Sequence, residues 1–181
     1  MRVEVAFRRK ELVFDEETKT HTSQVARWLI DTNGKPGLML MGLCGNGKTT
    51  MMRSLARLIE YVTEATVGYS KRSVVTMLSA KEIARMCAAA DKERKEFKEL
   101  FSLEMLGIDD LGEEPKEIMS YGMIYTPLID LLCERYNRQL TTIITTNLTK
   151  EQLSEKYGPR VYDRFKEMFT IITFTNQSYR K

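Results

Sequence analysis

The sequence predicts an α/β domain of three layers, in which helices cover both faces of a parallel sheet. Short apolar segments rich in β-branched residues alternate along the chain with longer segments of helical periodicity, which is the pattern of a parallel sheet. A glycine-rich loop, residues 42–50, joins one of these strands to the next helix. The 181 residues, of which 43% are hydrophobic, suit one domain with a sizeable core. We therefore expect a single domain over 1–181, with 1–35 as a lead-in and 36–181 as its core.

Hydrophobic spacing and turn residues define the expected elements in order. Helices are expected where apolar residues recur three and four positions apart, as at Leu55, Leu58 and Ile59, and strands where apolar and β-branched residues run unbroken. The expected helices are 22–30, 51–62, 81–100, 124–132, 149–158 and 159–168. The expected strands are 38–41, 73–80, 103–110, 140–147 and 169–176. Thr126 and Pro127 either start the helix at 124–132 or kink an earlier start.

Charge, cysteine content and hydropathy narrow the class of protein. Lys and Arg number 28 against 25 Asp and Glu, a net charge of +3, so the chain has no strong basic field that would by itself indicate nucleic acid. Cys44, Cys87 and Cys133 lie far apart, with His21 as the single histidine, which favours reduced thiols over a zinc site. No apolar run reaches the roughly 20 residues of a membrane span, and the N-terminus lacks the apolar segment of a signal peptide. We expect a cytoplasmic protein with no membrane partner.

The glycine-rich loop matches the phosphate-binding pattern G-x-x-x-x-G-K-[ST]. Its residues are Gly42, Leu43, Cys44, Gly45, Asn46, Gly47, Lys48 and Thr49, followed by Thr50. Glycines let backbone N–H groups curl around phosphate oxygens, and the N-terminus of the next helix adds partial positive charge. Lys48 is expected to contact the β- and γ-phosphates and the Thr49 hydroxyl to bind Mg²⁺. Since a predicted strand precedes the loop and a predicted helix follows it, we expect a nucleotide there. Cys44 then needs only to be small, and a redox role is its alternative.

Two carboxylates, Asp109 and Asp110, end the expected strand 103–110. Doubly wound sheets bind ligands at the carboxyl ends of their strands, so Asp109 is the expected second protein ligand of Mg²⁺. Successive strand residues point in opposite directions, so Asp110 reaches the site only if the strand ends there, where it would turn toward the attacking water. Capping of the next loop is the alternative for Asp110. Glu113 and Glu114 are expected to be solvated.

The strand 140–147 ends in Thr145, Thr146 and Asn147. An amide at this point would orient water beside the γ-phosphate without adding charge. The same Asn-Leu-Thr sequence also fits the cap of the next helix. Asn147 follows the acidic pair by one helix and one strand, which favours the role in orienting water over the role as a helix cap.

Together these residues resemble the AAA+ ATPases of the bacterial helicase-loader group, DnaC and DnaI, and the IstB-like transposition helpers. The resemblance covers roughly residue 34 to the end and rests on "GLCGNGKT", "LGIDDLG", "RYNRQLTTIITTNLTKEQL", "YGPRVYDRFKEM" and "FTNQSYR". It implies a P-loop NTPase fold of the AAA+ type, with five parallel strands in the order 5-1-4-3-2, and it implies ATP as the nucleotide. It also implies head-to-tail assembly on single-stranded DNA, with a replicative helicase or a transposase as the partner.

The resemblance assigns roles to several polar residues. Asp109 would be the Walker B metal ligand, Asn147 sensor 1 and Arg164 an arginine finger that reaches the ATP of the neighbouring subunit. Arg180 would serve as sensor 2, and Arg160 is the reserve candidate for the finger. The surrounding sequence alone suggests for Arg164 only a surface ion pair with Asp163 or Glu167.

Three departures from the group affect the expected function. Asp110 stands where a catalytic Glu is usual, so we expect slow hydrolysis that assembly or DNA stimulates. Only seven residues follow Phe174, which leaves little or no room for a helical lid. The roughly 35 residues before the loop are too few for the helicase-gripping region of the loaders. We therefore expect either the isolated ATPase domain of a longer protein or a minimal relative.

The helix at 81–100 offers a possible DNA surface. The basic residues in the second half of this helix are Lys92, Arg94, Lys95 and Lys98. Acidic residues are interspersed among them, and Lys92 with Glu96 makes an ordinary i,i+4 pair, so a solvated charged helix is favoured over a DNA surface. Phe97 and Phe101 are expected in the core rather than stacked on bases.

Two other function classes stay open beside an assembling ATPase. A P-loop small-molecule kinase fits the length, but it would need an acceptor pocket and an arginine-rich lid that the sequence does not provide, and it would leave Asn147 and Arg164 without a role. A nucleotide-gated binding module with negligible hydrolysis fits the short carboxylate of Asp110. We expect an ATPase acting in DNA replication as a DnaC-like helicase loader, with an IstB-like transposition helper as the near alternative.

Overall fold

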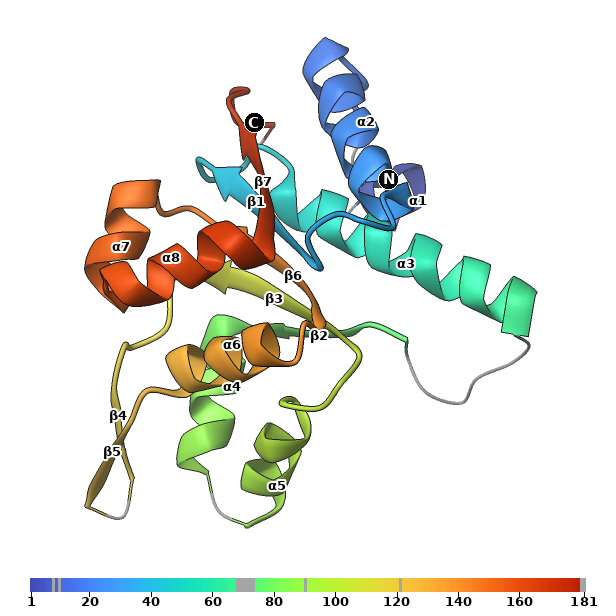
Figure 1. The fold of residues 1–181 in the computed structure, drawn as a ribbon. Helices are drawn as coiled ribbons and strands as arrows, with labels where there is room; N and C mark the ends of the chain where they lie inside the picture. The colour runs from blue at the N-terminus through green and yellow to red at the C-terminus, as the bar shows by residue number, and fades with distance from the viewer. Residues whose placement is uncertain (8, 10, 68–73, 90, 121, 180–181) are drawn as a thin grey trace.

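Five parallel strands make the central sheet of the computed structural model, which describes residues 1–7, 9, 11–67, 74–89, 91–120 and 122–179 (Figure 1). The strands are β1 (Gly37–Gly42), β2 (Thr76–Ser79), β3 (Met105–Leu111), β6 (Thr141–Thr146) and β7 (Phe169–Phe174). They lie in the order β2-β3-β6-β1-β7, and every neighbouring pair is parallel. Counted along the chain without the separate hairpin β4–β5, this is the order 5-1-4-3-2 that the resemblance implied.

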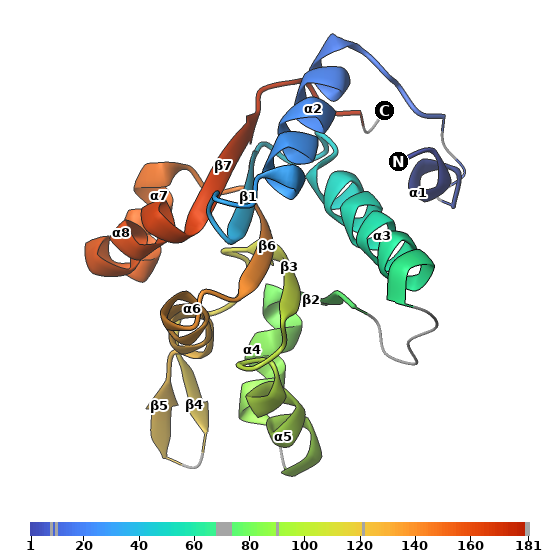
Figure 2. The same ribbon diagram turned by 45° about the vertical axis from the view of Figure 1, so that its right-hand side comes forward.

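Helices pack on both faces of the sheet, which gives the three layers (Figures 1 and 2). The helices are α1 (Arg2–Phe7), α2 (Glu16–Ile30), α3 (Lys48–Val67), α4 (Ala80–Ala88), α5 (Asp91–Glu99), α6 (Pro127–Asn137), α7 (Lys150–Tyr157) and α8 (Pro159–Met168). Strand alternation divides the core between the two faces. In β1, Leu38 and Leu40 pack with residues of α2 and α3, whereas Met39 and Met41 face the side of α4 to α8.

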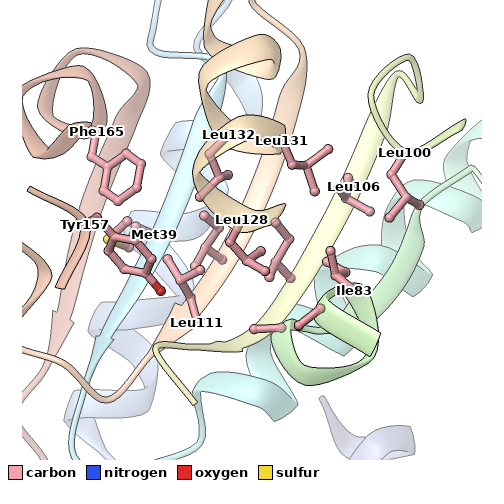
Figure 3. Close-up of a cluster of buried hydrophobic side chains, with 14 of the residues drawn as sticks. Met39, Ile83, Leu100, Leu106, Leu111, Leu128, Leu131, Leu132, Tyr157 and Phe165 are labelled. Carbon is pink, nitrogen blue, oxygen red and sulfur yellow. The ribbon is translucent and has the colours of Figure 1, made fainter. Parts of the chain in front are cut away.

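The larger of the two cores lies under α4, α6, α7 and α8 (Figure 3). Ile83 of α4 and Leu131 of α6 are fully buried against strand residues such as Leu106. The same layer buries Arg135, whose guanidinium donates to Thr142 Oγ1 and to the carbonyl oxygens of residues 100, 103 and 141. Burial lowers the Arg135 pKa to about 10, and its four acceptors fasten the end of α6 to the start of β6 and to the segment between α5 and β3.

Several element boundaries differ from those expected. Helix α2 starts at Glu16, six residues before the expected 22, because Asp15 caps it by accepting from the Thr18 N–H at 2.8 Å. The expected helix 81–100 is two helices, α4 and α5. Residues 88–95 carry no large apolar side chain that could pack on the core. Burial therefore does not stabilise a continuous helix there.

A β-hairpin that the sequence did not predict projects beyond α6, away from the central sheet (Figures 1 and 2). Its strands β4 (Ile118–Ser120) and β5 (Met123–Tyr125) are antiparallel. Ile124 therefore belongs to a strand, and α6 starts at Pro127, which confirms the first of the two interpretations of that residue. Arg94 of α5 donates to the Tyr125 hydroxyl at 2.9 Å and its guanidinium lies 5.3 Å from the ring centroid. This contact holds the hairpin to α5.

Candidate nucleotide-binding site

A cavity of about 450 Å³ opens above the loop 42–49, which we call the phosphate loop. Its polar lining comes from Cys44 to Thr50 together with Asp110, Glu113 and Asn147. Its apolar lining includes Met1, Val5, Leu12, Val13, Met51 and Phe174. A cavity that combines an anion-binding loop with apolar walls has the chemical character that a nucleotide requires.

The phosphate loop has the backbone that only glycine allows at two positions. Gly42 has φ 148°, and a Cβ there would lie 2.3 Å from the Phe174 carbonyl oxygen. Gly47 has φ 97°, a conformation that L side chains rarely adopt. These glycines let the loop turn tightly into α3, so that the helix N-terminus faces the cavity.

Lys48 is buried, with 5% of its surface exposed, and its ammonium group lies among four oxygen acceptors. Lys48 Nζ donates to the carbonyls of Gly42 and Leu43 at 2.7 Å each, to Asn46 Oδ1 at 3.1 Å and to Asn147 Oδ1 at 2.9 Å. The lysine thus joins the phosphate loop to the end of β6, as expected if both act on one phosphate group. A phosphate entering the loop must exchange places with one or more of these acceptors.

The two expected Mg²⁺ ligands lie together beside the loop. Thr49 Oγ1 donates to Asp109 Oδ1 at 2.9 Å, and Thr145 Oγ1 donates to the same oxygen at 2.6 Å. Arg53 approaches the other carboxylate oxygen at 3.9 Å. Among the described residues no group of three or more His, Cys, Asp or Glu side chains forms a metal site. One hydroxyl and one carboxylate fit a Mg²⁺ ion that takes its remaining ligands from phosphates and water, as such ions usually do.

Asp110 reaches the cavity by a route that differs from the expected one. The strand does not end at Asp110 but runs on to Leu111, with an irregular register between Ile108 and Leu111. Asp110 occupies this bulge with φ 55°, and its N–H donates to Thr145 Oγ1 at 2.8 Å. The bulge breaks the alternation of the strand, so Asp110 lines the cavity although its neighbour Asp109 faces Thr49. The left-handed conformation costs a non-glycine residue roughly 1 kcal/mol.

The two glutamates after the bulge have different environments. Glu113 is half-exposed, lines the cavity and pairs with Lys81 at 2.9 Å, which lowers the Glu113 pKa. Glu114 is 3% exposed and accepts from the Gly112 N–H at 2.8 Å and from the Tyr157 hydroxyl. The expectation that Glu114 is solvated was wrong, because the turn after β3 folds it beneath α7, where a hydroxyl and an ammonium group satisfy the carboxylate.

Two of the three arginines that the resemblance singled out, Arg160 and Arg164, belong to the described residues and lie outside the cavity walls. The Arg164 guanidinium lies over the Tyr136 ring, 5.6 Å from its centroid. The acids beside it are engaged elsewhere, since Asp163 pairs with Lys166 at 2.5 Å and Glu167 accepts from the Tyr136 hydroxyl. Arg160 is exposed, and neither it nor Arg164 is among the described residues that line the cavity. Arg180 falls outside the described residues, so its assignment stays a prediction.

Helix α5 has the features of a solvated charged helix. Lys92, whose side chain is 90% exposed, lies 4.0 Å from Glu96, and Arg94 contacts the hairpin. Phe97 is 8% exposed and meets Phe101 edge to face at 5.2 Å, so both phenylalanines belong to the core, as expected.

Sequence reasoning missed the wall of the cavity that the two ends of the chain supply. The N-terminal segment, treated as a lead-in, contributes Leu12, Val13, Thr18 and His21, and the C-terminal segment contributes Tyr179. The sequence signals for this wall were the capping pattern Asp15-x-x-Thr18 and the tyrosine of "FTNQSYR".

None of the described helices is long and apolar enough to cross a membrane.

Solved structures match the chain closely in shape, although no family model and no curated protein sequence does. A DnaC helicase loader superposes with a TM-score of 0.63 at 22% identity, over 89% of this chain and 92% of that one. DnaI superposes with a TM-score of 0.66 at 18% identity, over 91% of this chain and 88% of that one. The chain has the fold of the helicase loaders. This result agrees with the predicted three-layer α/β fold, whose five parallel strands lie in the expected order.

The same fold extends to a replication initiator. DnaA bound to AMPPCP and single-stranded DNA matches with a TM-score of 0.62 at 15% identity, over 92% of this chain and 49% of that one. The chain therefore spans about half of that solved DnaA chain and most of the solved DnaC and DnaI chains.

Proposed function

We propose that the chain is a cytoplasmic ATPase that acts in DNA replication as a DnaC-like helicase loader, assembling head to tail on single-stranded DNA. The observation that carries the proposal is the convergence of Lys48, Thr49, Asp109, Asp110 and Asn147 at one edge of the sheet. Each supplies a different part of a nucleotide-hydrolysing site, and the fold that presents them is that of helicase loaders.

Each residue has a role that its contacts support. Lys48 and the backbone N–H groups of the loop bind the phosphates, and Thr49 with Asp109 would hold Mg²⁺, which supplies positive charge to the phosphate oxygens when bound. Asp110, turned into the cavity by the bulge, polarises the attacking water. Asn147 orients that water and accepts from Lys48. The apolar walls of the cavity take the base, with adenine implied by the family resemblance.

Assembly completes the site with positive charge from a neighbour. The developing charge on a transferred phosphoryl group needs a cation, and arginine fingers typically contribute on the order of 10³–10⁵ in turnover. Arg164 and the reserve candidate Arg160 lie away from the cavity of their own chain. A head-to-tail arrangement would bring one of them to the γ-phosphate of the next subunit. The partner would then be the replicative helicase, with a transposase as the partner in the IstB-like alternative.

An ATPase assay with and without single-stranded DNA tests the proposal, with light scattering used to follow oligomer size. Turnover that DNA stimulates together with assembly is the expected result. Nucleotide binding with no turnover under any condition would instead support the nucleotide-gated binding module. ADP that accumulates only with a phosphorylated small molecule would support the kinase.

A further inference from the structure

After β7 the chain turns back across the phosphate loop and contacts consecutive residues of it. Asn46 Nδ2 donates to the Phe174 carbonyl at 3.0 Å, and Asn176 Nδ2 donates to the Asn46 carbonyl at 3.1 Å. The Tyr179 N–H donates to the Gly45 carbonyl at 2.9 Å. Residues 174–179 therefore lie on the phosphate loop as a strap, which we call the C-terminal clasp.

The clasp fixes the direction of two peptide groups in the loop. In a trans peptide the C=O and the N–H point in opposite directions, and the described residues contain no cis peptide. Since the clasp bonds the carbonyls of Gly45 and Asn46, the N–H groups of the same two peptide units, those of Asn46 and Gly47, face away from the clasp. Successive backbone N–H groups that are held in a fixed direction can form the anion-binding concavity of a phosphate loop.

The clasp also joins the phosphate loop to the start of α2. The Tyr179 hydroxyl donates to Asp15 Oδ2 at 2.8 Å and lies 3.1 Å from Thr18 Oγ1. Asp15 is the N-cap of α2, and Thr18 is 4% exposed. The Tyr179 ring covers Gly47, where a Cβ would lie 3.7 Å from it. One residue thus bonds the loop through its backbone and the helix cap through its side chain.

We propose that Asn176 and Tyr179 are positioning residues for the phosphate loop, and that the Tyr179 hydroxyl couples anion binding in the loop to the anchoring of α2. The proposal rests on the proposed function, because it concerns the same nucleotide site. A bound anion fixes the peptide groups of the phosphate loop. Because the Tyr179 N–H is bonded to the Gly45 carbonyl, the Tyr179 backbone is then fixed as well, and its hydroxyl stays at the cap of α2. The coupling is reciprocal, so the α2 cap affects anion affinity by the same factor.

Hydrogen exchange in the presence of inorganic pyrophosphate tests the coupling. Pyrophosphate occupies only the phosphate loop, whereas a nucleotide base would touch the wall at 11–13 directly. In the wild type, pyrophosphate is expected to slow exchange both in 42–50 and in 15–21, the second by roughly fivefold or more. Tyr179→Phe keeps the ring and the backbone N–H but lacks the hydroxyl, so it is expected to keep protection of 42–50 and lose that of 15–21. Tyr61→Phe, an exposed tyrosine on α3, is the matched control.

The outcomes separate this proposal from the proposed function. Equal protection of 15–21 in wild type and Tyr179→Phe would overturn the coupling while leaving nucleotide binding intact. No protection of 42–50 in the wild type by either pyrophosphate or ADP would contradict the proposed function and this inference with it. Because the coupling is reciprocal, Tyr179→Phe should also weaken pyrophosphate binding, by the same factor by which protection of 15–21 against hydrogen exchange is lost. An unchanged affinity for pyrophosphate would count against the coupling.

The positioning role of Asn176 has its own test. Asn176→Leu removes the donor to the Asn46 carbonyl but keeps a branched side chain with the same number of heavy atoms, and it also removes an Oδ1 atom that has no hydrogen-bond partner in the described structure. The expected result is ADP and ATP affinity weakened together by roughly 3- to 10-fold, with kcat at saturation little changed. A purely structural role would instead lower the melting temperature and leave the affinity of the folded protein unchanged, which would overturn the assignment.

Discussion

Lys48 Nζ donates to Asn147 Oδ1 at 2.9 Å, so the lysine at the start of α3 is hydrogen-bonded to the amide that directly follows β6. The contact places the phosphate-binding cation beside the residue proposed to orient water. It also means that Asn147 Oδ1 competes with a bound phosphate for the ammonium group of Lys48.

Two substitutions of Asn147 should separate binding from turnover. Asn147→Asp adds a carboxylate beside the buried ammonium group, and the resulting ion pair competes with phosphate, so KM for ATP should rise by roughly 10-fold. Asn147→Ala removes the group that orients water, so kcat should fall by roughly 10²-fold with little change in nucleotide affinity. Steady-state kinetics and ADP titration check both results. Asn33→Asp, in an exposed turn, controls for the added charge, and an equal effect of all three variants would contradict the role of Asn147.

The two neighbouring aspartates should give different defects. Asp109→Asn weakens the Mg²⁺ site that Asp109 shares with Thr49, so Mg²⁺-dependent ATP binding should weaken. Asp110→Asn should retain MgATP and lose turnover, because it cannot polarise water. Asparagine tolerates the left-handed backbone of residue 110, so the bulge should survive. Binding measured with and without Mg²⁺, beside turnover, distinguishes the two, and identical defects would show that the division of roles is wrong.

Arg164 should act on a neighbouring subunit. Arg164→Ala keeps an intact phosphate loop but offers no finger, and Lys48→Ala keeps the finger but has a damaged loop. Neither variant should turn over ATP alone, since loss of a finger costs on the order of 10³–10⁵, yet mixed protomers should recover part of the activity. If Arg164 serves only its contact with Tyr136, its removal should cost about 0.5–1 kcal/mol of stability and leave turnover near normal. Inactivity without rescue would place its role within one chain, and Arg160→Ala would then be tested.

The lysines of α5 should reveal whether that helix meets DNA. Lys95 and Lys98 are exposed one turn apart, whereas Lys92 pairs with Glu96 and Arg94 holds the hairpin. If the two lysines contact phosphates, reversing both to Glu should weaken binding to single strands of any sequence. The salt dependence of binding should also become shallower by about 0.7 in log–log slope per lost contact. Lys150→Glu on α7 is the control, and an unchanged slope would confirm the solvated helix that the contacts of α5 favour.

Local patterns predicted the elements that carry the site, but not the contacts between distant segments. The positions of the phosphate loop, Asp109 and Asn147 were predictable because each comes at the end of an apolar run in the sequence. The bulge at Asp110 was not, because its N–H bonds to Thr145 on another strand. The hairpin was missed because Ile124 and Leu128 are also spaced as in a helix.

The C-terminal clasp shows the same limit more plainly. Tyr179 bonds to Asp15, which lies 164 positions earlier, and neither residue belongs to a motif that names the other. The helix-cap pattern Asp15-x-x-Thr18 predicts only a local bond, from the Thr18 N–H to the Asp15 carboxylate. A contact between side chains near opposite ends of the sequence can be recognised only in the structure, where the strand order of the sheet brings these two segments together.

The most direct test of the account is calorimetric titration of MgADP into the wild type and into Lys48→Ala. Lys48→Ala should still fold, but with a free energy of unfolding lowered by about 1–3 kcal/mol, because its four buried acceptors lose their donor. The wild type should bind one nucleotide per chain. The variant should bind roughly 10- to 100-fold more weakly, the effect of losing a charged donor to phosphate, and Lys92→Ala, an exposed lysine, should bind as the wild type does. Equal binding by wild type and a folded Lys48→Ala, or no binding by the wild type, would contradict the assignment of this cavity as a nucleotide site.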